Sequence, residues 1–329
     1  MRVLLPVLAG GLLLLLLIWP QIVKQRDFIS DVLKSSAVPL NSKAQIDMKK
    51  VSFYSEDEKG QPFILTADKI WETDSVNKVV QIDTPKGEMT LNSGVKLFSD
   101  SPVAHLYQEK GQVYFENDIR LTSDNGYQIE ASEVYVEYQN QSAHSDNPIS
   151  VRGEKIDLDA MGFQMRQNGN EIDFMGKTKV VLKDAQKGQN ILITSDGLME
   201  VRQKSQTITF YKNVLTNYDS NKITCDKMTA YFKSKGKNEY ELKSVQAQKN
   251  VKIVTVNEVV TGDDAFYDLI KEKAFITGNV VITRAEGTME GSRAVVDMKT
   301  GISHLEAGNK NKTKKQWVKG TLYPSKMKK

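Results

Sequence analysis

The sequence predicts an all-β protein whose body follows one N-terminal membrane-spanning helix. Three observations support this class. Two short signatures return five times along the 329 residues, apolar and polar side chains alternate within them, and the chain begins with a long apolar run. Alternation with a period of two is typical of a strand with one dry and one wet face. Because repetition constrains architecture before any single residue does, the five copies indicate one β unit used repeatedly.

The first signature is an apolar residue, a spacer, a Gly, Asn or Lys, a usually polar residue, and an apolar or β-branched one. It occupies residues 115–119, 174–178, 210–214, 247–251 and 276–280. The second is an apolar residue, a spacer, a small residue, and Ser or Asp. It occupies residues 129–132, 193–196, 223–226, 260–263 and 289–292. Within each copy the two lie 10, 15, 9, 9 and 9 residues apart, too close for a crossover helix, so the unit is antiparallel.

The N-terminus predicts a membrane anchor. Residues 3–23 are almost entirely apolar, and about 20 such residues cross a bilayer core. No Ala-x-Ala-like cleavage site follows the run, which favours an uncleaved signal anchor over a signal peptide. We therefore expect a transmembrane signal anchor at residues 1–26 and a juxtamembrane connector at residues 27–43.

From residue 44 the strand pattern hardly stops. Residues 51–53 and 63–67 predict a first hairpin, and clusters of Gly, Pro, Asn, Asp and Ser separate the apolar runs that follow. The copies ending at residues 119 and 178 are 59 apart, and the later spacings tighten to 36, 37 and 29. The spacing tightens after the copy at residues 174–178, so we place a module boundary near residues 186–190. The modules are residues 44–186 and 187–308.

The C-terminal tail, residues 309–329, carries the basic charge. It holds eight lysines and no acidic residue, so removing +8 from the total of +4 leaves the rest of the chain at −4. A solvated end is the first interpretation, and binding to anionic head groups is the alternative. Trp317, Val318, Leu322 and Tyr323 alternate loosely with the lysines and could order as one more edge strand. An acidic body argues against nucleic acid as a partner.

Catalytic motifs are absent from the sequence. No phosphate loop, nucleophile elbow or metal-binding helix is found, so we expect no enzyme, no cofactor and no metal site. Cys225 is the only cysteine and fills the small-residue position of its repeat. Asp263 recurs in register with Asp196 and Asp226, which favours an architectural role. His105, His144 and His304 are isolated and are expected at the surface beside turns.

Strands with one apolar face must close on a second sheet, a barrel or a ligand. If the sheets of a sandwich splay apart, the interior becomes a groove for hydrocarbon, at about 0.8 kcal/mol per buried methylene. Exposed strand edges in such a sandwich invite pairing with another chain. The candidates for the groove are the apolar residues at even offsets, for which core packing is the equally open alternative: Ile119, Leu121, Ile129, Phe174, Val180, Leu182, Ile193, Phe210, Val214, Ile223, Val251, Ile253, Ile276, Val280 and Ile282.

The order and register of these motifs resemble the LptC and LptA (OstA-like) family of lipopolysaccharide transport bridge proteins. Residues 48–53, 62–67 and 147–176 are similar to LptC, and residues 193–301 are similar to LptA. The chain thus looks like an LptC-type module fused to an LptA-type module. The resemblance implies two consecutive open β-jellyrolls that shield lipid A acyl chains. It also implies an inner-membrane, single-pass protein with its body in the periplasm.

The same resemblance implies particular partners. These are lipopolysaccharide itself, an inner-membrane lipopolysaccharide ABC exporter with LptF/LptG-like subunits, and an LptA-like or outer-membrane LptD-like jellyroll that docks edge to edge. Two features depart from the family pattern. Both modules lie in one chain, and Lys212 and Lys249 replace the Gly of the repeat.

Two other functions stay open at this point. One is a structural, membrane-anchored β-repeat tether without a lipid groove, which a fully packed interior would favour. The other is an envelope polysaccharide hydrolase, with a pair such as Asp157 and Asp159 as its carboxylates. A photo-crosslinker at Phe210 or Ile276 is expected to capture lipopolysaccharide if the carrier hypothesis is right.

Overall fold

The structure of the protein is a computed structural model. It describes residues 47–56, 62–90, 94–137, 140, 142–184, 189–218, 220–236, 239–297, 303–307 and 318–322. The predicted anchor and connector lie outside these residues. Over the part of the chain that is described, no helix is long and apolar enough to cross a membrane. The chain forms two compact units, an N-terminal unit up to Met175 and a C-terminal unit from Gly176. The module boundary predicted after residue 186 stays a prediction.

The all-β prediction is confirmed for the described residues. In the N-terminal unit, one 3-10 turn, η1 (Gln167–Gly169), interrupts the strands. Its strands are β1 (Asp47–Glu56), β2 (Pro62–Asp74), β3 (Val79–Asp83), β4 (Lys86–Thr90), β5 (Lys96–Asp100), β6 (Val103–Tyr107), β7 (Gln112–Ser123), β8 (Gln128–Glu137), β9 (Ser142–Ser145), β10 (Ile149–Arg152), β11 (Ile156–Ala160), β12 (Gly162–Arg166) and β13 (Glu171–Met175).

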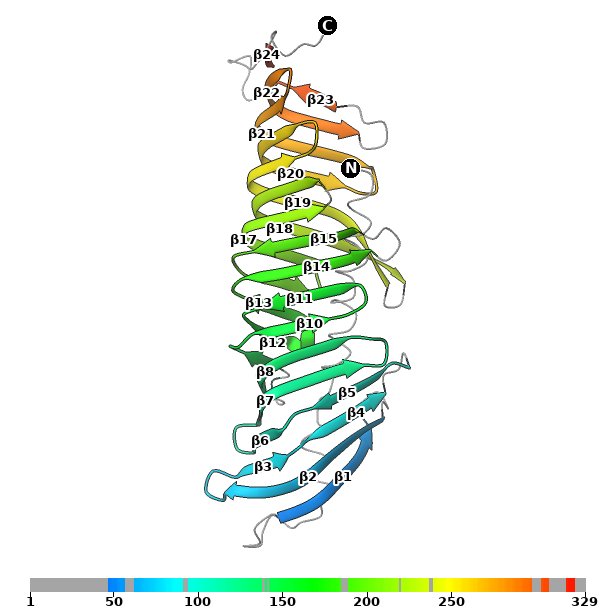
Figure 1. The fold of residues 1–329 in the computed structure, drawn as a ribbon, viewed down its shortest axis with the longest axis vertical. Helices are drawn as coiled ribbons and strands as arrows, with labels where there is room; N and C mark the ends of the chain where they lie inside the picture. The colour runs from blue at the N-terminus through cyan, green and yellow to red at the C-terminus, as the bar shows by residue number, and fades with distance from the viewer. Residues whose placement is uncertain are drawn as a thin grey trace. The chain divides into compact units, whose positions relative to one another are not determined.

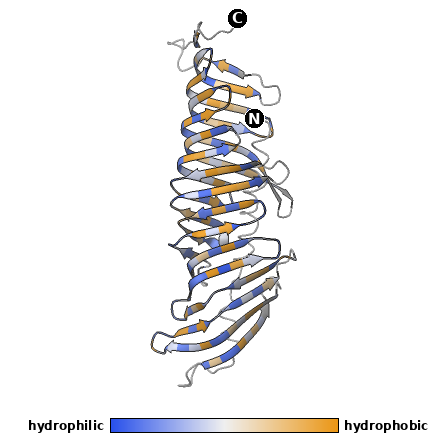
Figure 2. Ribbon diagram, in the orientation of Figure 1, coloured by the Kyte–Doolittle hydropathy of each residue, from blue (hydrophilic) through white to orange (hydrophobic). Residues whose placement is uncertain are grey.

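The C-terminal unit is built in the same way, and Figure 1 labels the strands of both units along the chain. Its strands are β14 (Thr178–Asp184), β15 (Gln189–Ser195), β16 (Met199–Arg202), β17 (Thr207–Tyr218), β18 (Asn221–Gly236), β19 (Glu239–Val254), β20 (Val259–Asp268), β21 (Lys273–Arg284), β22 (Gly287–Asp297), β23 (Ser303–Glu306) and β24 (Lys319–Leu322). Orange and blue segments alternate along many of these strands in Figure 2, as the period of two predicts.

Long strands in each unit belong to two sheets at once. In β7, residues 112–116 pair with β6, whereas residues 120–123 pair with β5. β2 and β8 divide in the same way between β3 and β4 and between β9 and β10. The N-terminal unit therefore contains sheet 1, through β3, β6, β9, β12 and β13, and sheet 2, through β4, β5, β10 and β11.

The C-terminal unit repeats this division in β17 to β22. We call sheet 3 the set that runs from β16 to β23, and sheet 4 the set that runs from β14 and β15 to β24. Every long strand from β17 to β22 passes from one sheet to the other. We call the line of these crossing points the seam.

In four of its five copies the first sequence signature is the crossing point of a strand, and the copy at residues 174–178 lies between β13 and β14. In those four copies the third and fourth residues adopt left-handed backbone conformations, with φ of 67° and 50° at Lys212 and Asn213 and 76° and 48° at Gly278 and Asn279. The strand pairing shifts register at the same positions. Gly and Asn tolerate positive φ, which explains their recurrence there. The function of that Gly is therefore conformational, and Lys249, with φ of 61°, adopts the same conformation.

The second signature supports the crossing points. Its small residue lies directly opposite the last residue of the first signature, as in Val214 with Cys225 and Val251 with Gly262. A Cβ built at Gly262 would lie 2.6 Å from Ile276 Cγ2, so the position needs a small side chain. The acidic residue that follows accepts a hydrogen bond from the Asn of the next crossing point. These bonds are Asn213 to Asp196 (2.9 Å), Asn250 to Asp226 (2.8 Å) and Asn279 to Asp263 (3.1 Å).

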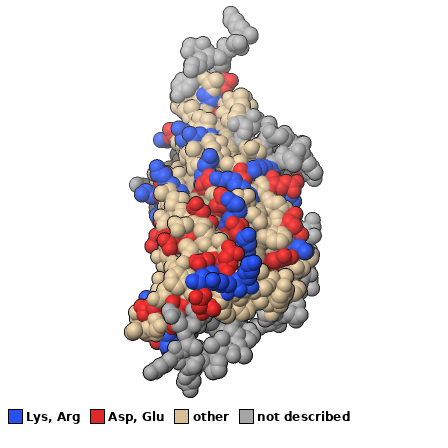
Figure 3. Space-filling model, turned by 60° about the horizontal axis from the view of Figure 1, so that its bottom comes forward, with Lys and Arg blue, Asp and Glu red and all other residues tan. Residues whose placement is uncertain are grey.

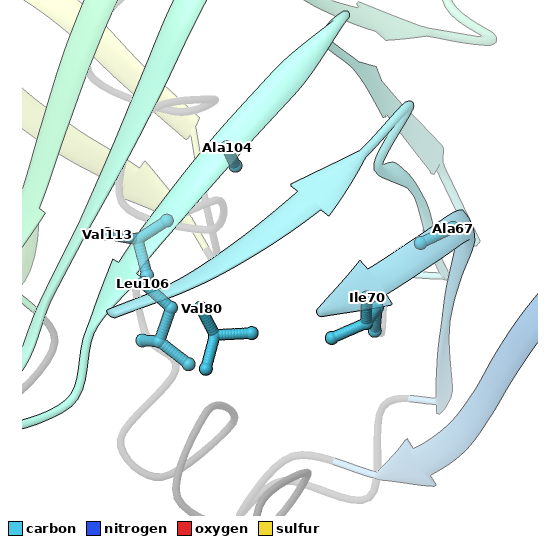
Figure 4. Packing of buried hydrophobic residues seen from close by; sticks show 6 residues of the cluster. All are labelled: Ala67, Ile70, Val80, Ala104, Leu106 and Val113. Atoms are coloured by element: carbon cyan, nitrogen blue, oxygen red, sulfur yellow. The ribbon is translucent and has the colours of Figure 1, made fainter. Parts of the chain in front are cut away.

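The apolar core lies between the sheets of each unit. At the start of the N-terminal unit, Figure 4 shows Val80, Leu106 and Val113 beside one another, with Ile70 from the preceding strand. They come from β2, β3, β6 and β7, so the core joins strands that are far apart in the sequence. The partly buried Phe115 packs against this cluster. Burial of these side chains stabilises each unit by about 25 cal/mol per Å² of apolar surface.

Candidate functional site

The structure places the predicted groove residues on the inner faces of the sheets, in both units. Eleven of the fifteen are buried, and Ile119, Leu121, Ile129 and Ile223 are half-buried. The N-terminal unit contains Ile119, Leu121, Ile129 and Phe174. The C-terminal unit contains the rest, with Phe210 and Ile276 in sheet 3 and the following residues in sheet 4: Val180, Leu182, Ile193, Val214, Ile223, Val251, Ile253, Val280 and Ile282.

On β8, β18 and β19 the exposure of the inner-face side chains rises with distance from the seam, whereas on β14 and β15 the outer residues Leu182 and Ile191 are 0% exposed. Val251, beside the seam, is 1% exposed, and Ile253, two residues further along β19, is 9% exposed. The same change separates buried Cys225 from half-buried Ile223 on β18. In the N-terminal unit buried Ala131 is followed outward by half-buried Ile129. Packing between the sheets is therefore uneven. We call the far ends of the half-strands the mouth, and Ile129, Ile223 and Ile253 are the less well covered residues near it.

Exposed apolar residues stand on turns at the mouth of the C-terminal unit. Val256, between β19 and β20, is 77% exposed, and Ile270, between β20 and β21, is 58% exposed. Both turns are fixed by side chains. Thr255 Oγ1 accepts hydrogen bonds from the backbone N–H of Asn257 and Glu258, and Asp268 Oδ1 accepts from Ile270 and Lys271. Because β20 crosses the seam, its two ends bring these turns to opposite sides of the mouth.

The turn at Ile270 is also fixed electrostatically. Its hydrogen bond from the Lys271 N–H lowers the pKa of Asp268, so the carboxylate is ionised at neutral pH. The turn between β2 and β3 has the same construction, since Asp74 Oδ1 accepts from the N–H of Val76 and Asn77. Val76 at its tip is exposed. Sequence reasoning missed these residues, although an apolar residue two positions after Asp is an available signal.

The outer face of sheet 1 has a different chemistry. His105, Tyr114, Tyr135 and His144 stack in a row across four strands, with centroid separations of 6.2, 4.5 and 5.0 Å. The Tyr114 hydroxyl donates to Glu133 (3.0 Å), and burial raises the pKa of Tyr114. His105 and His144 were predicted beside turns, but they lie within β6 and β9 because their apolar neighbours alternate inward. Because this row makes the outer face of sheet 1 polar, the apolar surface of the sheet is its inner face.

Acidic and basic side chains are mixed on the surface of the described residues. On the face shown in Figure 3, basic and acidic side chains lie next to one another. Surface ion pairs include Arg284 with Glu258 (2.8 Å) and Arg293 with Glu306 (3.4 Å). Mixed charge of this kind gives no extended positive surface for nucleic acid on the face shown in Figure 3.

Residues that could be considered catalytic have structural partners. Cys225 is buried, and desolvation raises the pKa of its thiol to about 12, so it is protonated at neutral pH. Asp159 forms an ion pair with Arg152, and Asp157 accepts a hydrogen bond from the Gly153 N–H. Over the described ranges, no group of three or more His, Cys, Asp or Glu residues could hold a metal ion.

Comparison with protein families identifies the class. Residues 11–183 match the family described as "Lipopolysaccharide-assembly, LptC-related". Residues 192–302 match the family described as "LptA/(LptD N-terminal domain) LPS transport protein". The class is therefore that of noncatalytic lipopolysaccharide transport bridge proteins, which act in the bacterial envelope. Because the first match spans more than half of the chain, the protein belongs to the LptC-related family, with an LptA-type module joined to it.

Fourteen chains of known structure match the protein. One is the crystal structure of LptH, the LptA homologous periplasmic component of the conserved lipopolysaccharide transport device from Pseudomonas aeruginosa. It is 16% identical, with a TM-score of 0.34, and the match covers 43% of this chain and all of LptH. That similarity is too low to add to the argument. Among curated proteins none gives a significant match.

Proposed function

We propose that this protein carries lipopolysaccharide by holding its acyl chains in the mouth between the two sheets of each unit. The incomplete cover of inner-face apolar side chains on β7, β8 and β18 is the observation that supports this. Val214, Val251 and Val280 at the seam are already packed against protein. In contrast, Leu121, Ile129 and Ile223 still expose apolar surface on the inner face. Each acyl methylene that covers them gains about 0.8 kcal/mol.

The fifteen candidates then divide into two roles. Those beside the seam, such as Val214, Val251 and Val280, form the closed wall that keeps the sheets together. Those further out, such as Ile223 and Ile253, contact the acyl chains. Val256 and Ile270 extend the apolar surface onto the turns at the mouth, in the open β-jellyroll that the family match favours.

As a bridge, the chain would connect two membranes. We place it between an inner-membrane ABC exporter with LptF/LptG-like subunits and an outer-membrane LptD-like translocon, directly or through an LptA-like jellyroll. Contact would be made by pairing of sheet edges. Residues 1–26 would act as the inner-membrane anchor and the body would lie in the periplasm. The apolar run of the sequence supports the anchor.

The decisive experiment compares opposite faces of one strand. A photo-crosslinking residue at Ile223, on the inner face of β18, is expected to capture lipopolysaccharide in cells. The matched control is exposed Lys222, whose side chain points to the other face. Substitution Ile223→Asp is expected to block transport, and Lys222→Asp to leave it intact. Equal capture at the two positions, or none at Ile223 in folded protein, would contradict the proposal.

A structural tether is the second candidate, and the closed interior beside the seam favours it. Phe210 and Ile276, the crosslinking positions that the sequence predicts, are both buried. They are expected to capture less lipid than Ile223 if the mouth binds ligand. If no inner-face position captures lipid while the folded protein still links its partners, the tether is the correct function.

A further inference from the structure

Two short strands cover the last edge of the C-terminal unit, one in each sheet. β22 crosses the seam, so its two halves present edges in different sheets. Residues 293–296 pair with β23 in sheet 3, and residues 287–290 pair with β24 in sheet 4. β24 arises from the basic tail, where the sequence suggested an edge strand.

The cover over sheet 3 is held by side chains. Arg293 forms an ion pair with Glu306 (3.4 Å), and Ser292 Oγ donates to the Glu306 carbonyl oxygen (3.2 Å). Gly291 provides space for Leu305, since a Cβ built at Gly291 would lie 2.8 Å from Leu305 Cγ. This edge is closed by apolar packing, charge and backbone pairing together.

Within the described residues, the cover over sheet 4 is held by backbone pairing alone. All four residues of β24 are exposed, and Leu322 is 66% exposed. A Cβ built at Gly320 has no atom within 4 Å. Among the described residues, no side-chain hydrogen bond or ion pair joins β24 to the unit. Ordering a strand costs conformational entropy. A strand that buries no apolar side chain gains little hydrophobic free energy to offset that cost.

We propose that the Gly287–Glu290 edge of β22 is a docking site for the strand of a partner protein, and that β24 occupies it until that strand replaces it. This inference rests on the proposed bridging function and adds a resident cover to one edge. An unprotected edge strand pairs readily with other chains, and a displaceable cover limits pairing to partners that compete successfully.

The register of β24 indicates what kind of strand fits. Lys319 lies opposite Glu290, Gly320 opposite Met289 and Leu322 opposite Gly287. A Cβ at Gly287 would overlap the carbonyl oxygen of Thr321, so the incoming backbone must approach this residue closely. The partner strand is therefore extended, with a cation placed opposite Glu290 and its backbone against Gly287.

The test uses a fluorescent peptide with the sequence of residues 316–324 and the full-length chain. Thr321→Pro prevents β24 from pairing, so this variant is expected to bind the peptide at least tenfold more tightly than the unmodified chain. Gly320→Ala, which meets no neighbour, is the matched control and should bind like the unmodified chain. Adding Gly287→Val to Thr321→Pro should abolish binding, because the β-branched side chain occupies the approach.

A reversible lock provides the second measurement. Glu290→Cys with Lys319→Cys places two thiols directly opposite each other, within the range of a disulfide. Buried Cys225 does not compete for the bond. The oxidised protein should bind no peptide, and reduction should restore the affinity of the unmodified chain. Circular dichroism and the melting temperature show that each variant is folded.

Two outcomes overturn the inference. Equal peptide binding by the Thr321→Pro variant and the unmodified chain would show that β24 does not cover the edge. Equal binding by the oxidised and reduced proteins would place the peptide elsewhere. Lipid capture at Ile223 is measured separately, so loss of capture alone removes the carrier function and leaves the edge result standing.

Discussion

Replacing Lys212 by Gly should stabilise the protein, although Gly in a strand ordinarily destabilises it. Lys212 has φ of 67°, in the left-handed region that costs an L-residue roughly 1–2 kcal/mol. Gly removes this cost but adds roughly 0.5–1 kcal/mol of unfolded-state entropy. The side chain is exposed, and the Lys212 carbonyl still accepts from the Asp196 N–H (2.8 Å). The expected net gain is about 0.5–1 kcal/mol.

Urea unfolding of the full chain, followed by circular dichroism, measures this gain. Two controls fix the sign. Lys252→Gly, at an exposed strand position without positive φ, should lose about 0.5–1 kcal/mol. Gly278→Ala should lose more than about 1 kcal/mol, because φ is 76° and the new Cβ would overlap the Asp263 carboxylate. If Lys212→Gly is as destabilising as Lys252→Gly, the crossing-point interpretation of the repeat is wrong.

Four further outcomes are expected. Asp226→Ala should destabilise by about 1 kcal/mol through loss of the bond from Asn250, and a double-mutant cycle with Asn250→Ala should show that the two effects are not additive. Leu182→Ala should cost about 2–5 kcal/mol in urea unfolding, since the side chain is fully buried. Cys225, whose thiol pKa is raised to about 12, should not react with Ellman's reagent at pH 8 until urea unfolds the protein; rapid reaction in the native state would contradict its burial. The pKa of Asp268 is lowered in the folded state, so its contribution to stability is present above the ordinary value of 3.8 and is lost as the pH falls below it; Asp268→Asn should flatten stability between pH 5 and pH 3.

The fold class and the structural roles of Cys225 and Asp263 could be predicted from the sequence. Alternation of side chains fixed the strands, and the register of the repeats assigned Cys225 and Asp263 to architecture, as the structure confirms for both. These predictions succeeded because they depend on which face a residue occupies. A period of two determines the face directly.

The position of each residue relative to a crossing point could not be predicted in the same way. Val251 and Ile253 share a face and a chemistry, but they are 1% and 9% exposed. The signal for that point was present in Gly278 and the recurrent Asn, which tolerate positive φ. Lys212 and Lys249 made the crossing points hard to recognise from the sequence, because lysine does not favour a left-handed backbone conformation.

The exposed apolar residues on turns could not be predicted from strand patterns, for a different reason. Turn chemistry depends on the residue that accepts the backbone N–H groups, and Asp268 fulfils that role whatever follows it. The alternation of apolar and polar residues within strands therefore does not indicate the exposed Ile270 at the tip of the turn. Its significance depends on β20, which carries it to the mouth.

The shared strands also make the length of each unit adjustable in whole steps. One signature pair adds two strands to both sheets simultaneously, and the Asn213 to Asp196 bond of one copy is repeated in the next. Since neighbouring strands lie about 4.8 Å apart, every added copy extends the stack by roughly 10 Å. Gain or loss of a complete copy preserves register, whereas loss of a single strand would turn apolar faces outward. The reach of such a molecule can therefore evolve by duplication, without any new contact being designed.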